Sequence, residues 1–529
     1  MLAGLSRTKN IFPSGGGRGR AIVLSLLFPA FLFAQKDTIA IRYSNLISAG
    51  EMRTNLYVLA SDAYEGRETG KEGQKMAAKY IASYYKSCGI PPYKDSTYYQ
   101  TYPLNMIKPV PADVSINGKQ YAGNKDYYNF PGIAEQKQEA SEVLFLGYGI
   151  EEENYNDYGG ANVNGKVVMI LAGEPYNKEG NSLISGKKQA SFWSGYQKAK
   201  TDKARESGAK ALLVVVNDVA KGVEDNRHKL ETPSVKLESN PGQEMPVIYI
   251  SKEMADAILV KMSVEKIAGK ISKSGKPYKK KLKANLVIGI KNTSEKIQAE
   301  NVLGYVEGSD LKNELVVITA HYDHLGKEGN VVFNGADDDG SGTVAVMQLA
   351  KAFAQAKKEG RGPRRSMLFM NVSGEEKGLL GSSYYTSNPV YPLENTVCDL
   401  NIDMIGRMDE KHKTPDYIYL IGSDKLSSEL HSISEKNNKT YTNLALDYTY
   451  NDEKDKNRYY YRSDHYNFAK KGIPVIFYFN GVHADYHKET DEVEKIDFEK
   501  MEKITKLVFF TAWEIANRNE RLKVDSNKK

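Results

Sequence analysis

Cysteine is nearly absent from this chain. Its 529 residues include only two, Cys88 and Cys398, which lie far apart in the sequence. A chain of this size with two cysteines cannot depend on a disulfide framework for its stability. We expect both to be buried structural thiols, because Cys88 closes an amphipathic pattern and Cys398 lies in an apolar run. A single bridge between them is the alternative.

An excess of charge of one sign is also lacking. The chain has 73 Lys and Arg against 67 Asp and Glu, a formal net charge of +6, and this balance does not indicate nucleic-acid binding. The basic run at residues 275–283 is interpreted as a linker, with a nucleic-acid patch as the alternative. The hydrophobic fraction of 40% and the charged fraction of 26% are typical of a globular protein. The length exceeds one core of about 250 to 300 residues, so two folded units are expected.

Long hydrophobic runs are limited to one, at residues 21–34. It follows Arg7, Lys9, Arg18 and Arg20 and contains Pro29. A membrane-spanning helix needs about 20 apolar residues, so this shorter run predicts a signal peptide over residues 1–34. The mature protein is then expected in the periplasm or outside the cell, without stable membrane insertion. A retained membrane anchor is the alternative.

The remaining chain changes texture along its length. Short β runs joined by Gly- and Asn-rich turns fill residues 125–279, where no nucleophile, metal cluster or phosphate loop is seen. Apolar strands alternate with helices after residue 286, with strands at 315–320, 367–372, 397–402 and 475–479. This pattern predicts an α/β fold with a mostly parallel central sheet and helices on both faces. Ligands of such sheets bind beyond the carboxyl ends of the strands.

The first of these strands is followed by His321 and Asp323. Residues i and i+2 of a strand point to the same side, so Asp323 can hold the imidazole of His321 in the tautomer that binds a metal. His324 points away from that side. A histidine at the mouth of a strand, before an Asp-rich loop, indicates a metal ligand rather than a core histidine.

The Asp-rich loop GADDDGSG places Asp337, Asp338 and Asp339 side by side. Adjacent carboxylates repel one another, so such a loop is costly unless a cation neutralises it. One of the three should bridge metal ions. Capping of the helix that begins near Ser341 is the alternative role, and it suits Asp339 best.

Two further strands end in acids. The strand at 367–372 leads to Glu375 and Glu376, which point in different directions, so Glu376 can bind a metal while Glu375 accepts a proton from water. The strand at 397–402 ends at Asp403, where an unpaired buried carboxylate calls for a cation. A helix cap is the alternative for Asp403.

The last apolar strand leads into a segment that contains His483, Tyr486, His487 and Asp491. One histidine should complete a centre of nitrogen and carboxylate ligands, the set that zinc prefers. The residues alone do not choose between His483 and His487. All five motifs fall at strand ends on one edge of one predicted sheet.

In their order these motifs resemble the co-catalytic di-zinc aminopeptidases of family M28, in the subgroup with a protease-associated (PA) domain insertion. The resemblance covers most of the chain after the leader and rests on LASDAYEGRETGKEGQ, NGKVVMILAG, GAKALLVVV, AHYDHLG, GADDDGSG, SGEE, NIDMIG and DYH. It implies a zinc peptidase domain over residues 35–124 and 280–522, a PA domain over 125–279 and a basic tail at 523–529.

The resemblance also implies roles for individual residues. Asp338 matches the bridging carboxylate. One zinc ion is then held by His321 and Asp403 and the other by Glu376 and His487, since the family pattern takes the histidine that follows Tyr486. Glu375 matches the catalytic base. Further matches are to an oxyanion-binding residue and to supporting acids behind the ligands: Tyr486, Asp323 and Asp491.

The expected function is that of a secreted exopeptidase with two zinc ions per chain and peptide substrates, most simply an aminopeptidase that removes N-terminal residues. Alternatives are a carboxypeptidase-type member, a glutaminyl-cyclase-like enzyme and a receptor-like homologue without catalysis. A two-metal phosphoesterase is disfavoured, because no phosphate clamp is seen in the sequence.

Overall fold

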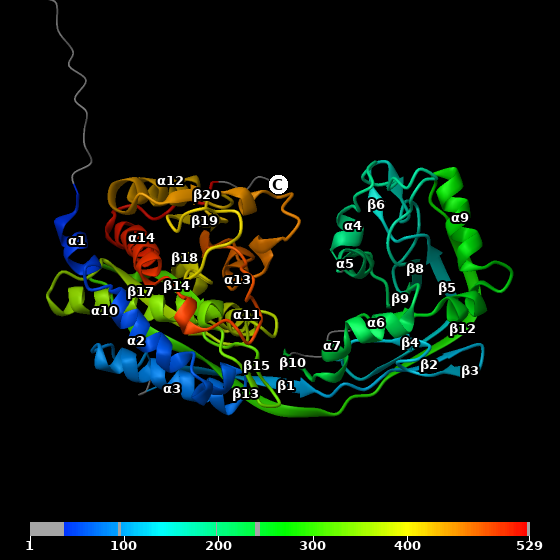
Figure 1. The fold of residues 1–529 in the computed structure, drawn as a ribbon, viewed down its shortest axis with the longest axis horizontal. Helices are drawn as coiled ribbons and strands as arrows, with labels where there is room; N and C mark the ends of the chain where they lie inside the picture. The colour runs from blue at the N-terminus through cyan, green and yellow to red at the C-terminus, as the bar shows by residue number, and fades with distance from the viewer. Residues whose placement is uncertain (1–35, 94–96, 197, 239–243, 526–529) are drawn as a thin grey trace, which may run out of the picture.

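The computed structural model describes residues 36–93, 97–196, 198–238 and 244–525. Two lobes, each built on its own sheet, lie side by side and are joined by long strands along one edge (Figure 1). We call the lobe with the nine-stranded sheet the peptidase lobe and the lobe with the eight-stranded sheet the insert lobe. The predicted signal peptide, residues 1–34, lies outside the described residues.

The peptidase lobe has a mixed sheet. Its strand order is β10-β1-β13-β17-β14-β18-β21-β19-β20, and four adjacent strands, β17-β14-β18-β21, run parallel. The strands on either side pair mostly antiparallel, so the expected mostly parallel sheet is found only at its centre. The bounds are β1 Tyr99–Ile107, β10 Ser234–Leu237, β13 Ser294–Val306, β14 Leu311–His321, β17 Arg365–Val372, β18 Thr396–Ile402, β19 Tyr417–Ile421, β20 Ala445–Asp447 and β21 Val475–Phe479.

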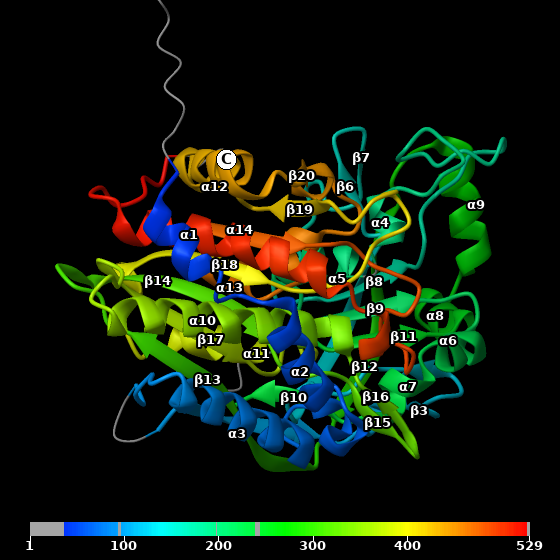
Figure 2. The same cartoon turned by 60° about the vertical axis from the view of Figure 1, so that its left-hand side comes forward.

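Helices cover both faces of this sheet, as a buried parallel centre requires. Side chains of β14 alternate between two cores: Val316 and Ile318 pack on the face with the long helices, Leu315 and Val317 on the other. Figure 2 shows α1, α2 and α14 grouped around α10 on the first face. Its helices are α1 Thr38–Ser44, α2 Ala49–Leu59, α3 Glu72–Ser87, α10 Gly342–Lys358, α12 Ser428–Asn437 and α14 Phe498–Asn517; the other face has α11 Leu380–Ser387 and α13 His465–Ala469.

The insert lobe repeats this plan on a smaller scale. Its sheet order is β3-β2-β12-β5-β8-β9-β11-β4, and β5, β8, β9 and β11 run parallel. Its strands are β2 Asp113–Ile116, β3 Lys119–Tyr121, β4 Tyr127–Tyr128, β5 Gln136–Leu146, β8 Val167–Leu171, β9 Ala211–Val215, β11 Val247–Ile250 and β12 Lys279–Ile290. Its helices are α4 Phe192–Gly195, α5 Ala199–Glu206, α6 Val219–Asp225, α7 Arg227–Glu231, α8 Lys252–Leu259 and α9 Val264–Ser274.

The insert lobe extends beyond both of its expected bounds. Its sheet begins with β2 before residue 125 and ends with β12 after residue 279, whereas β10, inside that range, joins the peptidase sheet. The basic run expected to be a linker ends in β12, which pairs with β5. Its lysines alternate with buried Leu282 and Ala284, so the run is the exposed face of a strand.

Three smaller expectations meet the structure here. Cys88 and Cys398 are free thiols; Cys398 is buried, but Cys88 is only half-buried. No helix among the described residues is long and apolar enough to cross a membrane. Of the expected basic tail, residues 523–529, the structure describes residues 523–525.

Candidate metal centre

The first half of the site gathers around His321, the last residue of β14. Its Nε2 atom lies 3.2 Å from Oδ1 of Asp338 and 3.7 Å from Oδ1 of Asp403, which directly follows β18. The two strands are adjacent and parallel, so their carboxyl ends meet at the same edge of the sheet. These three buried residues could hold one metal ion.

The second half lies on the other side of Asp338. Nε2 of His487 is 3.1 Å from Oδ2 of Asp338 and 3.4 Å from Oε2 of Glu376. Nδ1 of His324 is 2.9 Å from Oε1 of Glu376 and 4.0 Å from Oδ2 of Asp338. The two carboxylate oxygens of Asp338 therefore face different histidines, as a carboxylate that bridges two metal ions must do.

Nε2 of His324 is buried and has neither a hydrogen-bond nor an ion-pair partner among the described residues, since only Nδ1 of this ring contacts Glu376. An unsatisfied buried polar group costs about 1 to 3 kcal/mol, so such an atom calls for a ligand. His324, Asp338 and Glu376 form a second group that could hold a metal ion, and their nitrogen and oxygen donors suit zinc.

The three aspartates of the Asp-rich loop have separate tasks, and only Asp338 faces the histidines of both halves. Asp337 accepts the N–H of Gly406 at 2.6 Å, and its Oδ2 lies 3.2 Å from Nε2 of His483. Asp339 accepts the N–H of Gly342, the first residue of α10, at 2.8 Å. The structure thus separates the two histidines that the sequence left tied, because His483 pairs with Asp337.

The expected supporting acids bind backbone more than imidazole. Asp491 accepts the N–H groups of Asp337 and Asp338 at 3.0 and 3.1 Å and so holds the Asp-rich loop. Nδ1 of His321 lies 3.0 Å from the carbonyl oxygen of Asp323 but 3.8 Å from its carboxylate, so the carbonyl orients the ring. The carboxylate of Asp323 instead accepts the N–H of Glu375 at 3.2 Å.

Glu375 and Tyr486 line one cavity together with Asp338, Asp403 and His487. The phenol ring of Tyr486 stacks on the imidazole of His487, with 3.9 Å between ring centroids, and its hydroxyl accepts a hydrogen bond from Arg462 at 3.2 Å. The other walls of this cavity are mostly apolar: Met404, Tyr459, Phe477, Phe479 and Val482.

The pKa values in the site diverge. Burial, followed by the charges of Glu376 and Asp403, raises the pKa of Glu375 well above its usual range, although His321 opposes this. Burial also raises the pKa of Glu376, but the contacts with His324 and His487 outweigh this effect and lower it to about 2. Two adjacent glutamates with pKa values moved in opposite directions suit a proton acceptor and donor beside a metal ligand.

Two features of the site were missed by the sequence analysis. His324 was placed away from the metal side, because strand alternation was continued past His321, where β14 ends. Arg67, within the segment LASDAYEGRETGKEGQ, is buried and donates to the carbonyls of Tyr322, Asn334 and Gly335. It therefore ties the loop after β14 to the start of the Asp-rich loop, and only a side chain with several donors can do this.

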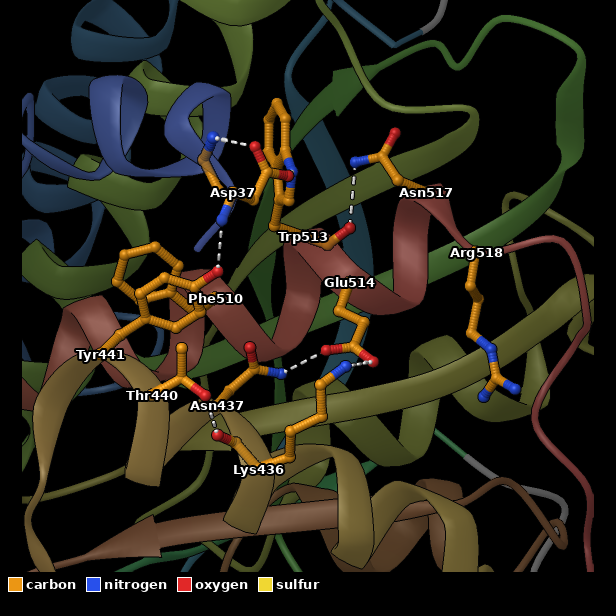
Figure 3. A pocket seen from close by; sticks show the side chains of 11 residues that line it. Asp37, Lys436, Asn437, Thr440, Tyr441, Phe510, Trp513, Glu514, Asn517 and Arg518 are labelled. Atoms are coloured by element: carbon orange, nitrogen blue, oxygen red, sulfur yellow. Dashed lines mark hydrogen bonds and ion pairs between the residues drawn. The ribbon is translucent and has the colours of Figure 1, made fainter. Parts of the chain in front are cut away.

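A different cavity, of about 460 Å³, lies between α1, α12 and α14 (Figure 3). Its polar groups bind one another: Lys436 and Asn437 both donate to Glu514, and Trp513 donates to Asp37. None of the candidate metal residues lines it. The residues that line this cavity join the start of α1 to α14. The cavity is not part of the metal centre.

Residues 301–512, which carry every candidate ligand, match peptidase family M28. This part of the chain is a peptidase M28 domain. A probable zinc metalloprotease of Pyrenophora teres is 28% identical over 264 residues, 42% of this chain and 52% of the relative. Aminopeptidase YwaD of Bacillus subtilis is 25% identical over 337 residues, 62% of this chain and 61% of the relative. The chain thus spans about half to three-fifths of the length of these curated relatives.

A solved structure shares the fold of the M28 domain and of the insert. This structure is the aminopeptidase from Aneurinibacillus sp. strain AM-1, which aligns with a TM-score of 0.52 and 18% identity. The alignment covers 92% of this chain and 98% of the aminopeptidase. At this identity the similarity establishes the α/β fold alone. The roles of individual residues in this chain depend on the geometry given above.

Proposed function

We propose that this protein is an exported, zinc-dependent exopeptidase that removes N-terminal residues from peptides. The observation that carries the proposal is the position of Asp338 between His321 and His487, each of which also meets a second carboxylate, Asp403 or Glu376. Two half-sites that share one carboxylate are the arrangement expected of a two-metal hydrolase. The probable zinc metalloprotease among the similar proteins supports the choice of metal.

The residues fit two zinc ions. His321, Asp338 and Asp403 would hold one, and Asp338, Glu376 and His487 the other. When bound, such a pair activates a water molecule and polarises the carbonyl of the scissile bond. His324 is positioned either as a further ligand to the second ion or as a partner that orients Glu376, since its Nδ1 lies 2.9 Å from that carboxylate.

Glu375 would take a proton from the attacking water and deliver it to the leaving amine. It lines the cavity beside Asp338 and Asp403, and its raised pKa suits both steps. The hydroxyl of Tyr486, at the same cavity, would donate to the oxygen of the former carbonyl, while Arg462 holds the phenol. The cavity, of about 30 Å³, is too small to enclose a large side chain, so the apolar walls around Phe477 and Phe479 would contact the N-terminal residue from one side.

The choice of an N-terminus is supported by the aminopeptidase of Bacillus subtilis among the similar proteins. The charge of the ligand carboxylates does not decide it, because bound zinc ions would neutralise them. Hydrolysis of leucine p-nitroanilide, compared with N-acetylated dipeptides, tests this choice. Cleavage of the blocked dipeptides alone would assign a carboxypeptidase instead.

Two other readings of the site give different results in the same assay. A glutaminyl-cyclase-like enzyme would cyclise peptides with N-terminal Gln without hydrolysing the anilide. A receptor-like homologue would do neither and would bind no zinc. We also propose that the insert lobe is the PA domain. We further propose that residues 1–34 direct export, and mass spectrometry of the N-terminus of the secreted protein would test this.

A further inference from the structure

A cavity of about 740 Å³ lies between the two lobes and reaches Glu376 at one end. This volume is within the range of ligand sites, about 300 to 1,000 Å³. From the peptidase lobe it is lined by Glu376, Lys377 and β10, and from the insert lobe by α5 and α7. It shares no lining residue with the apolar cavity beside Glu375. Glu376 therefore lines a cavity distinct from the one that Glu375 lines.

Contacts between the lobes hold this cavity in place. The guanidinium of Arg458, in the peptidase lobe, lies 5.5 Å from the ring of Phe192 and 5.2 Å from that of Tyr196, both in the insert lobe. Nδ1 of His228, on α7, lies 2.9 Å from a carboxylate oxygen of Glu328. The two lobes are thus in contact at two places.

The lining of the interlobe cavity is rich in cations. Four of its basic residues have a carboxylate partner: Arg205 with Asp202, Lys236 with Glu244, Lys377 with Glu68 and His228 with Glu328. Lys198 and Lys229 also line the cavity, are exposed, and have no carboxylate partner in the described part of the chain. The insert-lobe side of the cavity lining therefore has uncompensated positive charge.

This uncompensated positive charge matches the C-terminal carboxylate of a short peptide. We infer that the insert lobe recognises the C-terminal carboxylate of short peptides through Lys198 and Lys229, so that free-acid oligopeptides of a few residues are the preferred substrates. This rests on the proposed function, because the N-terminus must lie at the metal centre. With the N-terminal side chain against the apolar walls around Phe477 and Phe479, the residues after the scissile bond would pass Glu376 into the interlobe cavity. Lysine ammonium groups there form charge-assisted hydrogen bonds with a carboxylate.

The test compares Leu-Ala-Ala as a free acid with the same tripeptide as a C-terminal amide, with leucine p-nitroanilide as a substrate that lacks downstream residues. We expect kcat/KM to favour the free acid by roughly tenfold, mainly through KM, as for contacts made equally in ground and transition states. The double reversal Lys198→Glu with Lys229→Glu should abolish or invert this preference. The matched control, Lys270→Glu with Lys273→Glu on the exposed side of α9, should keep it.

The outcomes separate this inference from the proposed function. Equal cleavage of acid and amide by the wild-type protein, or a preference that survives the Lys198 and Lys229 reversal, overturns the inference while the anilide is still hydrolysed. No hydrolysis of the anilide or of either peptide overturns the proposed function itself. The wild type and both double variants should share one thermal midpoint within a few degrees, since all four lysines are exposed.

Discussion

The two lobes share a plan but differ in the residues that come after their strands. Each sheet has four parallel strands at its centre, β17-β14-β18-β21 in the peptidase lobe and β5-β8-β9-β11 in the insert lobe. In the insert lobe, polar residues after the strands bind nearby backbone: Asp218 accepts the N–H of Lys221, and Ser251 that of Met254. In the peptidase lobe, the corresponding acids and histidines face one another.

This difference shows that the fold supplies the position and the side chains supply the chemistry. A strand-end carboxylate that caps a helix is satisfied and has no need of a cation. Around Asp338 the nearest partners are other metal-binding groups, and Nε2 of His324 has no partner in the described structure. Among the described residues, both groups able to hold a metal ion lie in the peptidase lobe.

The largest effect is expected from Glu375→Gln in the peptidase lobe. The variant keeps the shape of the side chain but cannot accept a proton, so kcat on leucine p-nitroanilide should fall by about 10² to 10⁴. Zinc content, measured by atomic emission, should stay at the wild-type value, because Glu375 is not among the proposed ligands. Turnover within a few-fold of the wild type would remove Glu375 as the base.

The two histidines after β21 provide a matched pair for the next test. His487→Ala should lose the second metal ion and most activity, because His487 meets Asp338 and Glu376. His483→Ala should keep both ions, because His483 pairs with Asp337. Zinc content and kcat of both purified variants check this. Loss of metal from the His483 variant alone would reverse the assignment.

The buried carboxyl of Asp157 tests the insert lobe by pH. Burial raises its pKa from 3.8 to about 6, against the opposing N–H groups of Ile150 and Tyr148. The folded state therefore holds this proton more tightly, and stability falls as pH rises from about 4 to 6 and stays lower above it. Asp157→Asn removes this pH dependence. The free energy of unfolding of the variant minus that of the wild type should therefore be about 1 to 3 kcal/mol larger at pH 8 than at pH 4.

Urea unfolding of the insert lobe, followed by hydrogen exchange of the β8 and β9 amides, measures this increase. The same stability difference at both pH values would contradict the raised pKa. Activity at pH 8 should not change, because Asp157 lines neither of the two cavities beside the metal centre.

The smallest effect is expected from Asp218→Ala at the start of α6. Loss of its cap to Lys221 should cost about 1 kcal/mol of stability and leave zinc content and kcat unchanged. A thermal melt and the anilide assay measure both quantities. Altered metal content in this variant would show that strand ends of the insert lobe also contribute to the metal centre.

The sequence predicted the strand ends well because the strands are continuous apolar runs. Strands at 397–402 and 475–479 agree with β18 and β21, and His321 and Asp403 lie at strand ends as expected. The order of strands in the sheet was not predictable from local patterns. For example, β13 pairs antiparallel with β17, although the two strands are far apart along the chain. β12 was mistaken for a linker because lysines crowd its start.

Within the site, local patterns failed where several equivalent residues stood close together. Asp338 among three aspartates and His487 beside His483 were chosen by resemblance, and the distances support the same residues. His324 was missed because alternation ends with the strand. The contact between Arg67 and Gly335 of the Asp-rich loop joins residues 268 apart in the sequence and has no local signal.

Zinc titration of the chelator-treated protein tests the central claim most directly. Calorimetry of the full chain should show two zinc ions bound per chain, and hydrolysis of leucine p-nitroanilide should return as the sites fill. The Asp338→Asn variant, which alters the carboxylate shared by both half-sites, should bind less zinc and recover little activity. Absence of zinc binding, or full activity with a single ion bound, would contradict the two-metal centre.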